Sequence, residues 1–500
     1  MASHRRWFGR LLRALIMSLV IVVASCQGDS IGDLGENADI LSWEVSMVTG
    51  GAARIVGCLE VDPEVIPSCR VTIYYSDSSP FDIGAAKAVS TVEFDNEQNF
   101  ALTINDLEFA TTYNYCLVVD VNSRRHSGEV MSFTTLQNPY SHQSSLEMSA
   151  AMDLSATSSA NCYIVSSPGL YKFKTLQGNS KVSVGDIASV MVLWETFGSD
   201  ESPEQGDLIS GICLDGGYVV FMTAMYFSEG NAVIAAKDED GMILWSWHIW
   251  FTDQPQEHKY YNTAGIMMDR NLGATSAKPG EPRALGLLYQ WGRKDPFLNS
   301  YSIQNNSLAV STIAWPESVL SDSSHGTIEY SISNPTVFIT ANNRNYDWYY
   351  SGDNTTDDDR WTPSWQAKSV YDPCPPGWRV PDGDETNGVW SMALGSSSSY
   401  MADYDDVSKG VNFSGVFGVD NTIWYPASGG RDYFDATLIY VGVVGYFWSS
   451  SPYHDDSIFP NCAYELYFDQ SGNVEPSSNF SLRASAHSVR CCKMDYVEGY

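Results

Sequence analysis

Hydrophobic and polar positions alternate along much of this chain, which is typical of β-strands with one buried face. Runs rich in branched and aromatic residues, separated by Gly, Pro, Asn, Asp and Ser, predict several short strands. In the first part of the chain these runs are residues 54–59, 70–75 and 100–104. A second series comprises residues 161–165, 169–173, 218–222, 231–236 and 243–250. The pattern predicts a mainly β protein of about two to four domains.

One apolar run has a different character, because it is continuous from about residue 14 to residue 24. It follows four arginines (Arg5, Arg6, Arg10 and Arg13) and leads directly into Val23-Ala24-Ser25-Cys26. This order predicts a secretory signal over residues 1–25, since the run is too short for a stable membrane span. No second run of eighteen or more apolar residues follows in the sequence.

The residues just before Cys26 resemble the signal of bacterial lipoproteins. The resemblance implies cleavage before Cys26 and attachment of acyl chains such as palmitate, so that residues 26–38 become a lipid-anchored tether. Each buried methylene contributes about 0.8 kcal/mol to membrane attachment. The implied location is the bacterial outer membrane, and we expect the protein to be exposed at the cell surface, although the sequence does not decide between the periplasmic and the extracellular face. An ordinary secretory signal with a coincidental cysteine is the alternative.

The net charge of −32 limits the partners of the chain. An acidic surface is repelled by nucleic acid and by anionic lipid, so neither is expected as a direct partner. Aromatic residues make up 13% of the sequence, which is too many for a disordered acidic chain.

The clearest local signal in the first β region is Leu-Glu-Phe-Ala-Thr-Thr-Tyr-Asn-Tyr at residues 107–115. It resembles the part of a fibronectin type III domain in which a leucine precedes a tyrosine corner. The resemblance implies a β-sandwich over residues 39–137 that serves as a spacer or interaction module. In such a domain the Tyr113 hydroxyl reaches back to the upstream backbone. The same strand would carry Tyr115, Leu117 and Val119 on one face.

Ten cysteines in an exported chain indicate disulfides, because the compartment is oxidising. Cys58 and Cys69 lie at facing ends of two successive predicted strands, and a bridge between them would contribute about 3 kcal/mol. Cys116 could compete for either partner, and the sequence does not decide between these pairings. No pair of cysteines has the spacing of a structural zinc site.

Four ordered blocks mark the second half of the chain. They are residues 268–274 (MDRNLGA), 286–293 (GLLYQWGR), 374–381 (CPPGWRVP) and 447–451 (FWSSS), the last continued by 463–468 and 488–491. Together they resemble the Fibrobacter succinogenes major paralogous domain family over residues 256–494. The resemblance implies a C-type-lectin-like, formylglycine-enzyme-like α+β domain with a short helix pair, a small antiparallel sheet and a long irregular region. Residues 286–293 are expected to form an amphipathic helix with Trp291 inward.

Three further segments complete the expected organisation: a linker at residues 138–158, a second β module at 159–255 and a tail at 495–500. In the C-terminal domain we expect a disulfide between Cys374 and Cys491, which closes a loop of roughly 117 residues. Cys462 and Cys492 either pair with each other or stay as thiols.

Two aromatic groups are candidate ligand contacts. Tyr346, Trp348 and Tyr349 form a cluster with polar edges, and Arg431 and Tyr433 lie in a loop-like stretch. Exposed aromatic rings recur at binding hot spots. The alternative is that these residues fill a core beneath a long loop.

Residues 352–361 contain the densest acidic run of the sequence. Hard oxygen ligands on a loop suit Ca²⁺, so Asp353, Asp357, Asp358 and Asp359 are calcium candidates. The spacing does not match an EF-hand, and the triplets of sugar-binding C-type lectins are missing. A solvated acidic loop is therefore the favoured alternative.

Sequence motifs of zinc proteases, serine hydrolases and phosphate-binding loops are missing, so we do not expect an enzyme. The predicted function is that of a lipid-anchored surface protein for binding or adhesion, fimbria-associated or in contact with a glycan. Its expected partners are the membrane, an extracellular glycan or protein ligand, and other fimbrial subunits. A polysaccharide-processing enzyme or accessory protein and a structural pilus subunit are the alternatives.

Overall fold

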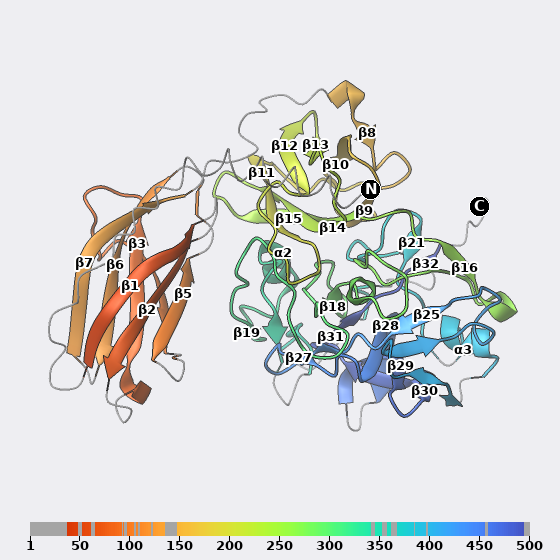
Figure 1. The fold of residues 1–500 in the computed structure, drawn as a ribbon. Coiled ribbons are helices and arrows are strands. Elements are labelled where there is room, and N and C mark those ends of the chain that lie inside the picture. Colours follow the sequence, from red (N-terminus) through yellow and green to blue (C-terminus); the bar gives the residue numbers. More distant parts are fainter. Residues whose placement is uncertain are drawn as a thin grey trace, which may run out of the picture. The chain divides into compact units, whose positions relative to one another are not determined.

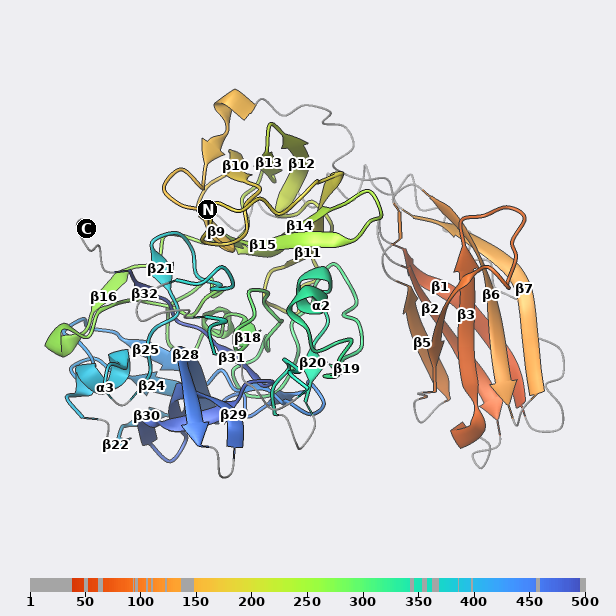
Figure 2. The ribbon, with the colours of Figure 1, turned by 180° about the vertical axis from the view of Figure 1, so that it is seen from behind.

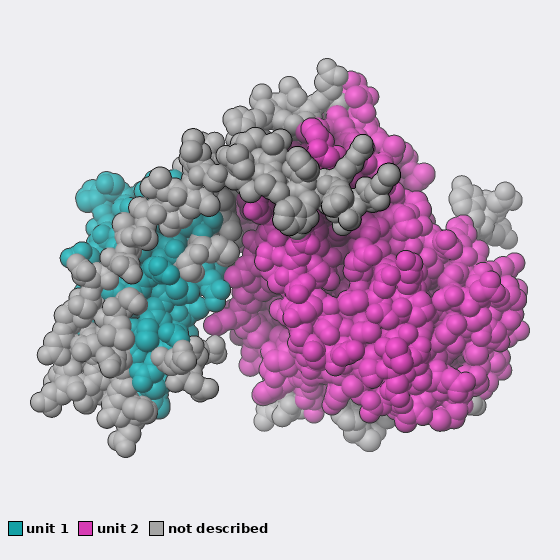
Figure 3. Space-filling view, viewed as in Figure 1, with its two compact units in different colours: residues 1–138 teal, residues 139–500 magenta. Residues whose placement is uncertain are grey.

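The computed structural model describes residues 38–48, 53–61, 66–92, 94, 98–104, 107–108, 111–121, 124–135, 148–341, 346–352, 358–361, 368–384, 386–396, 399–455 and 459–494. The chain divides into two compact units, residues 1–138 and 139–500 (Figure 3). The predicted signal and Cys26 lie outside the described residues. In the part of the chain that is described, no helix has the length and apolar character needed to cross a membrane.

Unit 1 is a fibronectin-III-like β-sandwich of two antiparallel sheets (Figure 1). One sheet has the order β1 (Ala38–Val48), β2 (Ala53–Val61) and β5 (Asn99–Ile104). The other has the order β4 (Lys87–Thr91), β3 (Arg70–Ser76), β6 (Thr112–Val121) and β7 (Arg124–Thr134). A single 3₁₀ turn, Ile66–Ser68, precedes β3. The strand runs expected at residues 54–59, 70–75 and 100–104 are therefore confirmed.

The core of unit 1 follows from strand alternation. Tyr115, Leu117 and Val119 of β6 are all fully buried in one cluster with residues of the facing sheet, as predicted. The tyrosine corner is confirmed as well, because the Glu108 N–H donates to the Tyr113 hydroxyl over 2.9 Å. This bond joins the end of the β5–β6 connection to the strand that it enters.

The predicted Cys58–Cys69 disulfide is wrong, and the reason is strand parity. On β2 the neighbouring Leu59 points into the core, so Cys58 faces the opposite side of its sheet and is only partly buried. Cys69 precedes β3 and is buried in the core between the sheets. Both residues are thiols in the structure.

Unit 2 begins with a second sandwich. Its outer sheet has the order β12 (Ile209–Asp215), β13 (Tyr218–Thr223), β10 (Leu170–Lys174) and β8 (Met152–Asp153). Its inner sheet has the order β11 (Ser189–Thr196), β14 (Gly230–Lys237), β15 (Ile243–Phe251) and β9 (Cys162–Val165). Since β8 pairs with β10, the segment expected to be a linker up to residue 158 already belongs to this sandwich, and a 3₁₀ turn at Met148–Ala150 precedes it.

Strand β15 is buried on both of its faces. Trp245, Trp247 and Ile249 fill the sandwich core, whereas Trp250 packs in a different core with Leu272 and Trp291 of the C-terminal region. Residues 159–255 and 256–494 therefore share a core within one unit, which differs from the two separate domains expected.

The C-terminal region is built on an eight-stranded, mainly antiparallel sheet (Figures 1 and 2). Its order is β22 (Tyr400–Met401), β30 (Asn473–Leu482), β29 (Phe459–Asp469), β28 (Val444–Asp455), β31 (Ala486–Ser488), β26 (Gly430–Arg431) and β27 (Leu438–Ile439), with β18 (Leu288–Gln290) on β31. A four-stranded sheet has the order β16 (Glu257–Lys259), β17 (Ile266–Met268), β32 (Cys492–Lys493) and β21 (Trp378–Arg379).

Smaller elements complete this region. β23 (Tyr404–Asp405), β24 (Gly410–Asn412) and β25 (Trp424–Pro426) form one sheet, and β19 (Val319–Leu320) pairs with β20 (Ile339–Thr340). The helices are short: α2 (Ile328–Ser333), α3 (Val389–Leu394) and 3₁₀ turns at Tyr261–Thr263 and Pro282–Ala284.

The prediction of a helix over residues 286–293 is wrong, because these residues contain strand β18 instead. Gly286 and Gly292 bracket the strand with φ of 74° and 84°, values that a helix excludes. All three residues of β18 are buried, so the apolar spacing reflects complete burial rather than one helical face. The inward orientation of Trp291 is nevertheless confirmed, since its side chain is fully buried.

The tyrosine corner gives a first prediction. Tyr113→Phe keeps the ring, which stacks on Phe133, but removes the hydroxyl that accepts from the Glu108 N–H. We expect unit 1 to lose about 1–2 kcal/mol of unfolding free energy. Hydrogen exchange of the β2 and β6 amides in the full chain measures this loss, and unchanged protection would contradict it.

Glu195 gives a second prediction, for pH dependence. This carboxylate on β11 is fully buried and accepts from the Gly206 and Ile209 N–H groups over 2.9 and 2.8 Å. Burial raises the pKa of Glu195 from 4.5 to about 8, although the two N–H donors oppose the shift. The folded state therefore holds a proton that the unfolded state releases between these pH values. The unfolding free energy of unit 2 should fall by up to about 1.4 kcal/mol per pH unit in this window.

Denaturant unfolding from pH 4.5 to 8 isolates this contribution. Glu195→Gln should remove it, whereas Glu239→Gln on the exposed β14–β15 loop should leave the pH slope of the natural protein in place. Equal slopes in the natural protein and in Glu195→Gln would show that Glu195 is ionised throughout.

Candidate functional site

The four sequence blocks meet in a buried network that joins distant parts of unit 2. Arg490 of the last block donates to the Asn271 side-chain oxygen of the first block through Nε and Nη2, over 3.2 and 2.9 Å. The indole N–H of Trp448 donates to the Tyr289 carbonyl, and that of Trp291 donates to the Ser449 carbonyl. All six of these residues are buried. The blocks therefore hold the fold together rather than line an open site.

The third block is linked to the last by the Cys374–Cys491 disulfide, which confirms the predicted pairing. Both cysteines belong to the core that also contains Trp291 and Trp448. The Lys368 ammonium lies against the same turn and donates to the carbonyl oxygens of Cys374 and Pro375 over 2.6 and 3.0 Å. The remaining cysteines of unit 2 are thiols, Cys462 and Cys492 included.

A group of aromatic side chains reaches the surface of unit 2 at the hairpin between β26 and β27. We name Tyr346, Tyr349, Tyr350, Tyr433 and Phe434 the Tyr433 surface. The ring centroids of Tyr346 and Tyr433 are 6.0 Å apart, and those of Tyr433 and Phe434 are 6.4 Å apart. Phe434 is 63% exposed and Tyr350 is 38% exposed, while the other three are partly buried. The two aromatic groups predicted from the sequence therefore meet through the rings of Tyr346 and Tyr433.

The backbone around these rings is held by hydrogen bonds to neighbouring segments. The Ala341 N–H after β20 donates to the Tyr433 carbonyl over 2.9 Å, and the Ala484 N–H donates to the Tyr346 carbonyl over 3.2 Å. The Tyr350 N–H donates to the Gly326 carbonyl over 2.8 Å. Three separate segments are therefore fixed beside one another, which gives the rings a common platform.

The prediction that Trp348 and Arg431 contact a ligand is wrong, because both side chains are buried. Trp348 is fully enclosed, and its indole N–H donates to the Trp291 carbonyl over 2.7 Å. Arg431 is 9% exposed and donates to the carbonyl oxygens of Leu298 and Ala436. Burial lowers the pKa of Arg431 to about 10. Neither side chain is therefore available at the surface.

Beneath the Tyr433 surface lies a stack of guanidinium and indole groups. The Arg360 guanidinium lies over the rings of Trp291 and Trp348, 5.0 and 4.9 Å from their centroids, and forms a bidentate pair with buried Asp347. The Arg483 guanidinium lies 4.4 Å from the Trp291 ring centroid. Sequence reasoning missed both arginines, because no local pattern marks a cation that is enclosed by aromatic rings far away in the chain.

Asp358, one of the calcium candidates, lies beside this stack. An oxygen of Asp358 lies 2.7 Å from Nη2 of Arg483, so the carboxylate faces a cation already. Asp359 is exposed, and Asp353 and Asp357 lie outside the described residues. Within the described ranges, no three His, Cys, Asp or Glu side chains are arranged to hold a metal ion.

His487 and Glu465 form a second buried polar group. Nδ1 of His487 lies 2.7 Å from Glu465 Oε2, while Glu465 Oε1 accepts from the Ser481 hydroxyl over 2.7 Å. The imidazole is stacked between the rings of Tyr446 and Trp448, with centroid distances of 4.5 and 4.4 Å. Because the ring is enclosed on both faces, this pair has the environment of a core interaction rather than of a general base that meets substrate.

Comparison with known proteins assigns no family. No family model matches the sequence, and no curated protein is similar to it. Among solved structures, the sensor domain of the anti-sigma factor RsgI4 from Pseudobacteroides cellulosolvens is 24% identical, with a TM-score of 0.17, over 21% of this chain and 100% of that one. SGBP-B of the Bacteroides ovatus mixed-linkage glucan utilization locus, in complex with a mixed-linkage heptasaccharide, is 13% identical, with a TM-score of 0.14, over 44% of this chain and 47% of that one. TM-scores this low assign no function.

Proposed function

We propose that this protein is a non-catalytic binding protein, anchored by lipid at the cell surface, and that it contacts a glycan through the Tyr433 surface. The observation that carries the proposal is the set of rings gathered there from segments 80 or more residues apart in the sequence. Exposed aromatic faces that the protein core already holds in place lose little conformational entropy on binding.

The charges around the Tyr433 surface favour an uncharged glycan as its ligand. Asp432 and Asp435 flank the rings in the same hairpin. Burial raises the pKa of the Tyr433 phenol, and the nearby Asp432 charge raises it further. The two arginines beneath the surface face the carboxylates of Asp347 and Asp358, so their charge is offset locally. A polysaccharide with carboxylate groups would meet repulsion here, whereas sugar hydroxyls can donate to the acidic side chains.

The proposed anchor and unit 1 fit the same function. Acyl chains on Cys26 would hold the chain at a membrane, and a sandwich between the anchor and unit 2 would act as a spacer. Other surface or fimbrial subunits remain proposed partners of this arrangement, since unit 1 is of a class that commonly mediates contacts.

Substitution in the hairpin tests the binding site. Tyr433→Ala should weaken binding to a neutral glycan about five- to tenfold, because one stacked ring contributes roughly 1 kcal/mol. Phe434→Ala should have a similar effect and disturbs the fold less, since this ring is mostly exposed. Tyr226→Ala is the matched control, because this tyrosine is 72% exposed on the β13–β14 loop of the same unit.

The measurement is a screen of the secreted chain from residue 27 onward on neutral and carboxylate-bearing glycans, followed by calorimetry with the best ligand. Equal losses in all three variants would refute the Tyr433 surface as the site. Consumption of the glycan, abolished by a single carboxylate substitution, would overturn the binding function in favour of an enzyme.

Growth with a radiolabelled fatty acid tests the anchor. The natural protein should take up the label and sediment with the outer membrane, whereas Cys26→Ser should do neither, because it lacks the sulfur that would carry the acyl chain. A natural protein that retains an intact leader, or that carries an unmodified Cys26 thiol, would contradict the proposed anchor.

A further inference from the structure

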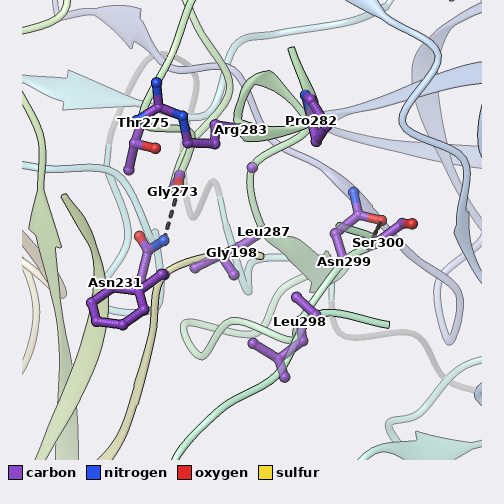
Figure 4. A pocket seen from close by; sticks show the side chains of 13 residues that line it. Gly198, Asn231, Gly273, Thr275, Pro282, Arg283, Leu287, Leu298, Asn299 and Ser300 are labelled. Atoms are coloured by element: carbon purple, nitrogen blue, oxygen red, sulfur yellow. Dashed lines mark hydrogen bonds between the residues drawn. The ribbon is translucent and has the colours of Figure 1, made fainter. Parts of the chain in front are cut away.

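A narrow cavity lies inside unit 2, where the inner sheet of the sandwich meets the first sequence block (Figure 4). Its wall includes Gly198 after β11, Asn231 of β14, Thr275 of the first block's loop and Asn299. Its volume is about 20 Å³. This is room for one water molecule and far too little for a sugar or a nucleotide.

Asn299 lines this cavity, and its side-chain N–H₂ group has no hydrogen-bond partner among the described residues. The side chain is 2% exposed, and its Oδ1 accepts from the Ser300 N–H over 2.7 Å. Its backbone carbonyl accepts from the Ala309 N–H over 2.9 Å. The Nδ2 group, in contrast, has no acceptor among the described residues. A buried N–H group without an acceptor costs about 1–3 kcal/mol.

Both polar atoms of the other amide on the wall already have a protein partner. Asn231 Nδ2 donates to the Gly273 carbonyl over 2.9 Å, as the dashed line in Figure 4 marks, and its Oδ1 faces Nε2 of His248 at 2.9 Å. It therefore cannot turn to satisfy Asn299. A small molecule in the cavity could supply the acceptor that Asn299 Nδ2 lacks.

The charges on the wall select a neutral molecule. Arg283 lines the cavity, but its guanidinium lies 2.9 Å from the Glu229 carboxylate and 3.7 Å from the Glu281 carboxylate. An anion would thus find no unbalanced cation here. A water molecule can accept from Asn299 Nδ2 and still donate to the Thr275 hydroxyl or to a backbone carbonyl.

We propose that this cavity is the binding site of one ordered water molecule held by Asn299 Nδ2. The water lies where the residues after β11 and on β14 meet the C-terminal part of unit 2, since both line the cavity. It fills a space that side chains leave empty where the two parts of unit 2 pack together. Buried waters of this kind are part of the folded structure.

A crystal structure of the secreted chain, from crystals soaked in bromide, tests the site directly. We expect a density peak 2.7–3.2 Å from Asn299 Nδ2 that has no anomalous bromide signal. An anomalous peak would identify an anion site instead. A cavity without a peak, or an Asn299 amide turned to a protein acceptor, would overturn the proposal.

Oxygen-17 relaxation dispersion tests it in solution by counting long-lived waters. Asn299→Leu removes the donor and Ala309→Val fills the wall, so each should lower the count by one. Asn387→Leu, in an exposed turn, should leave the count unchanged. Two variants guard against misfolding of either one, and an unchanged count in both folded variants would refute the site.

Discussion

The burial of the inner sheet on both faces is the constraint on which the rest of unit 2 depends. One face of β15 fills the sandwich core with Trp245 and Trp247, and the other sends Trp250 into the core of the C-terminal region. Each buried indole contributes several kcal/mol of hydrophobic stabilisation. Separating the two halves would expose this area to water, so they fold as one unit although the sequence presents them as successive modules.

Double burial forces the polar residues of the same strand to find partners inside the protein. His248 of β15 faces Asn231 and Tyr289, and burial lowers its pKa to about 3, which keeps the ring neutral at ordinary pH. Ser246 contacts Lys294 and Asp295, which form a buried ion pair. Such groups add little stability relative to a well-packed apolar pair, but removing one partner costs about 3–5 kcal/mol. They define one packing arrangement among the many that apolar contacts alone would allow.

Sequence periodicity predicted the strands of unit 1 and the face of β6 because both depend on local alternation. It led to a wrong disulfide between Cys58 and Cys69, because the two strands next to each other in sequence belong to different sheets. In each strand, alternation alone decides which side chains face the core. It also failed at residues 286–293, where burial on every side imitates a helical pattern. The Cys374–Cys491 disulfide could be predicted, because a Pro-rich turn and the end of a probable strand mark its two cysteines in the sequence. The burial of Trp348 and Arg431 could not be predicted, because it depends on segments from elsewhere in the chain that cover these side chains.

The same constraint explains why we place the proposed ligand contacts on a hairpin rather than on the sequence blocks. The blocks supply Asn271, Trp291, Trp448 and Arg490 to the core, where each is buried and hydrogen-bonded to a partner in another block. Changing any of them would disturb the fold before it altered recognition. The β26–β27 hairpin is different, because its strands are anchored by the sheet while its tip carries Phe434 in solvent. A surface of this kind can change its side chains, and therefore its ligand, without loss of the scaffold beneath it.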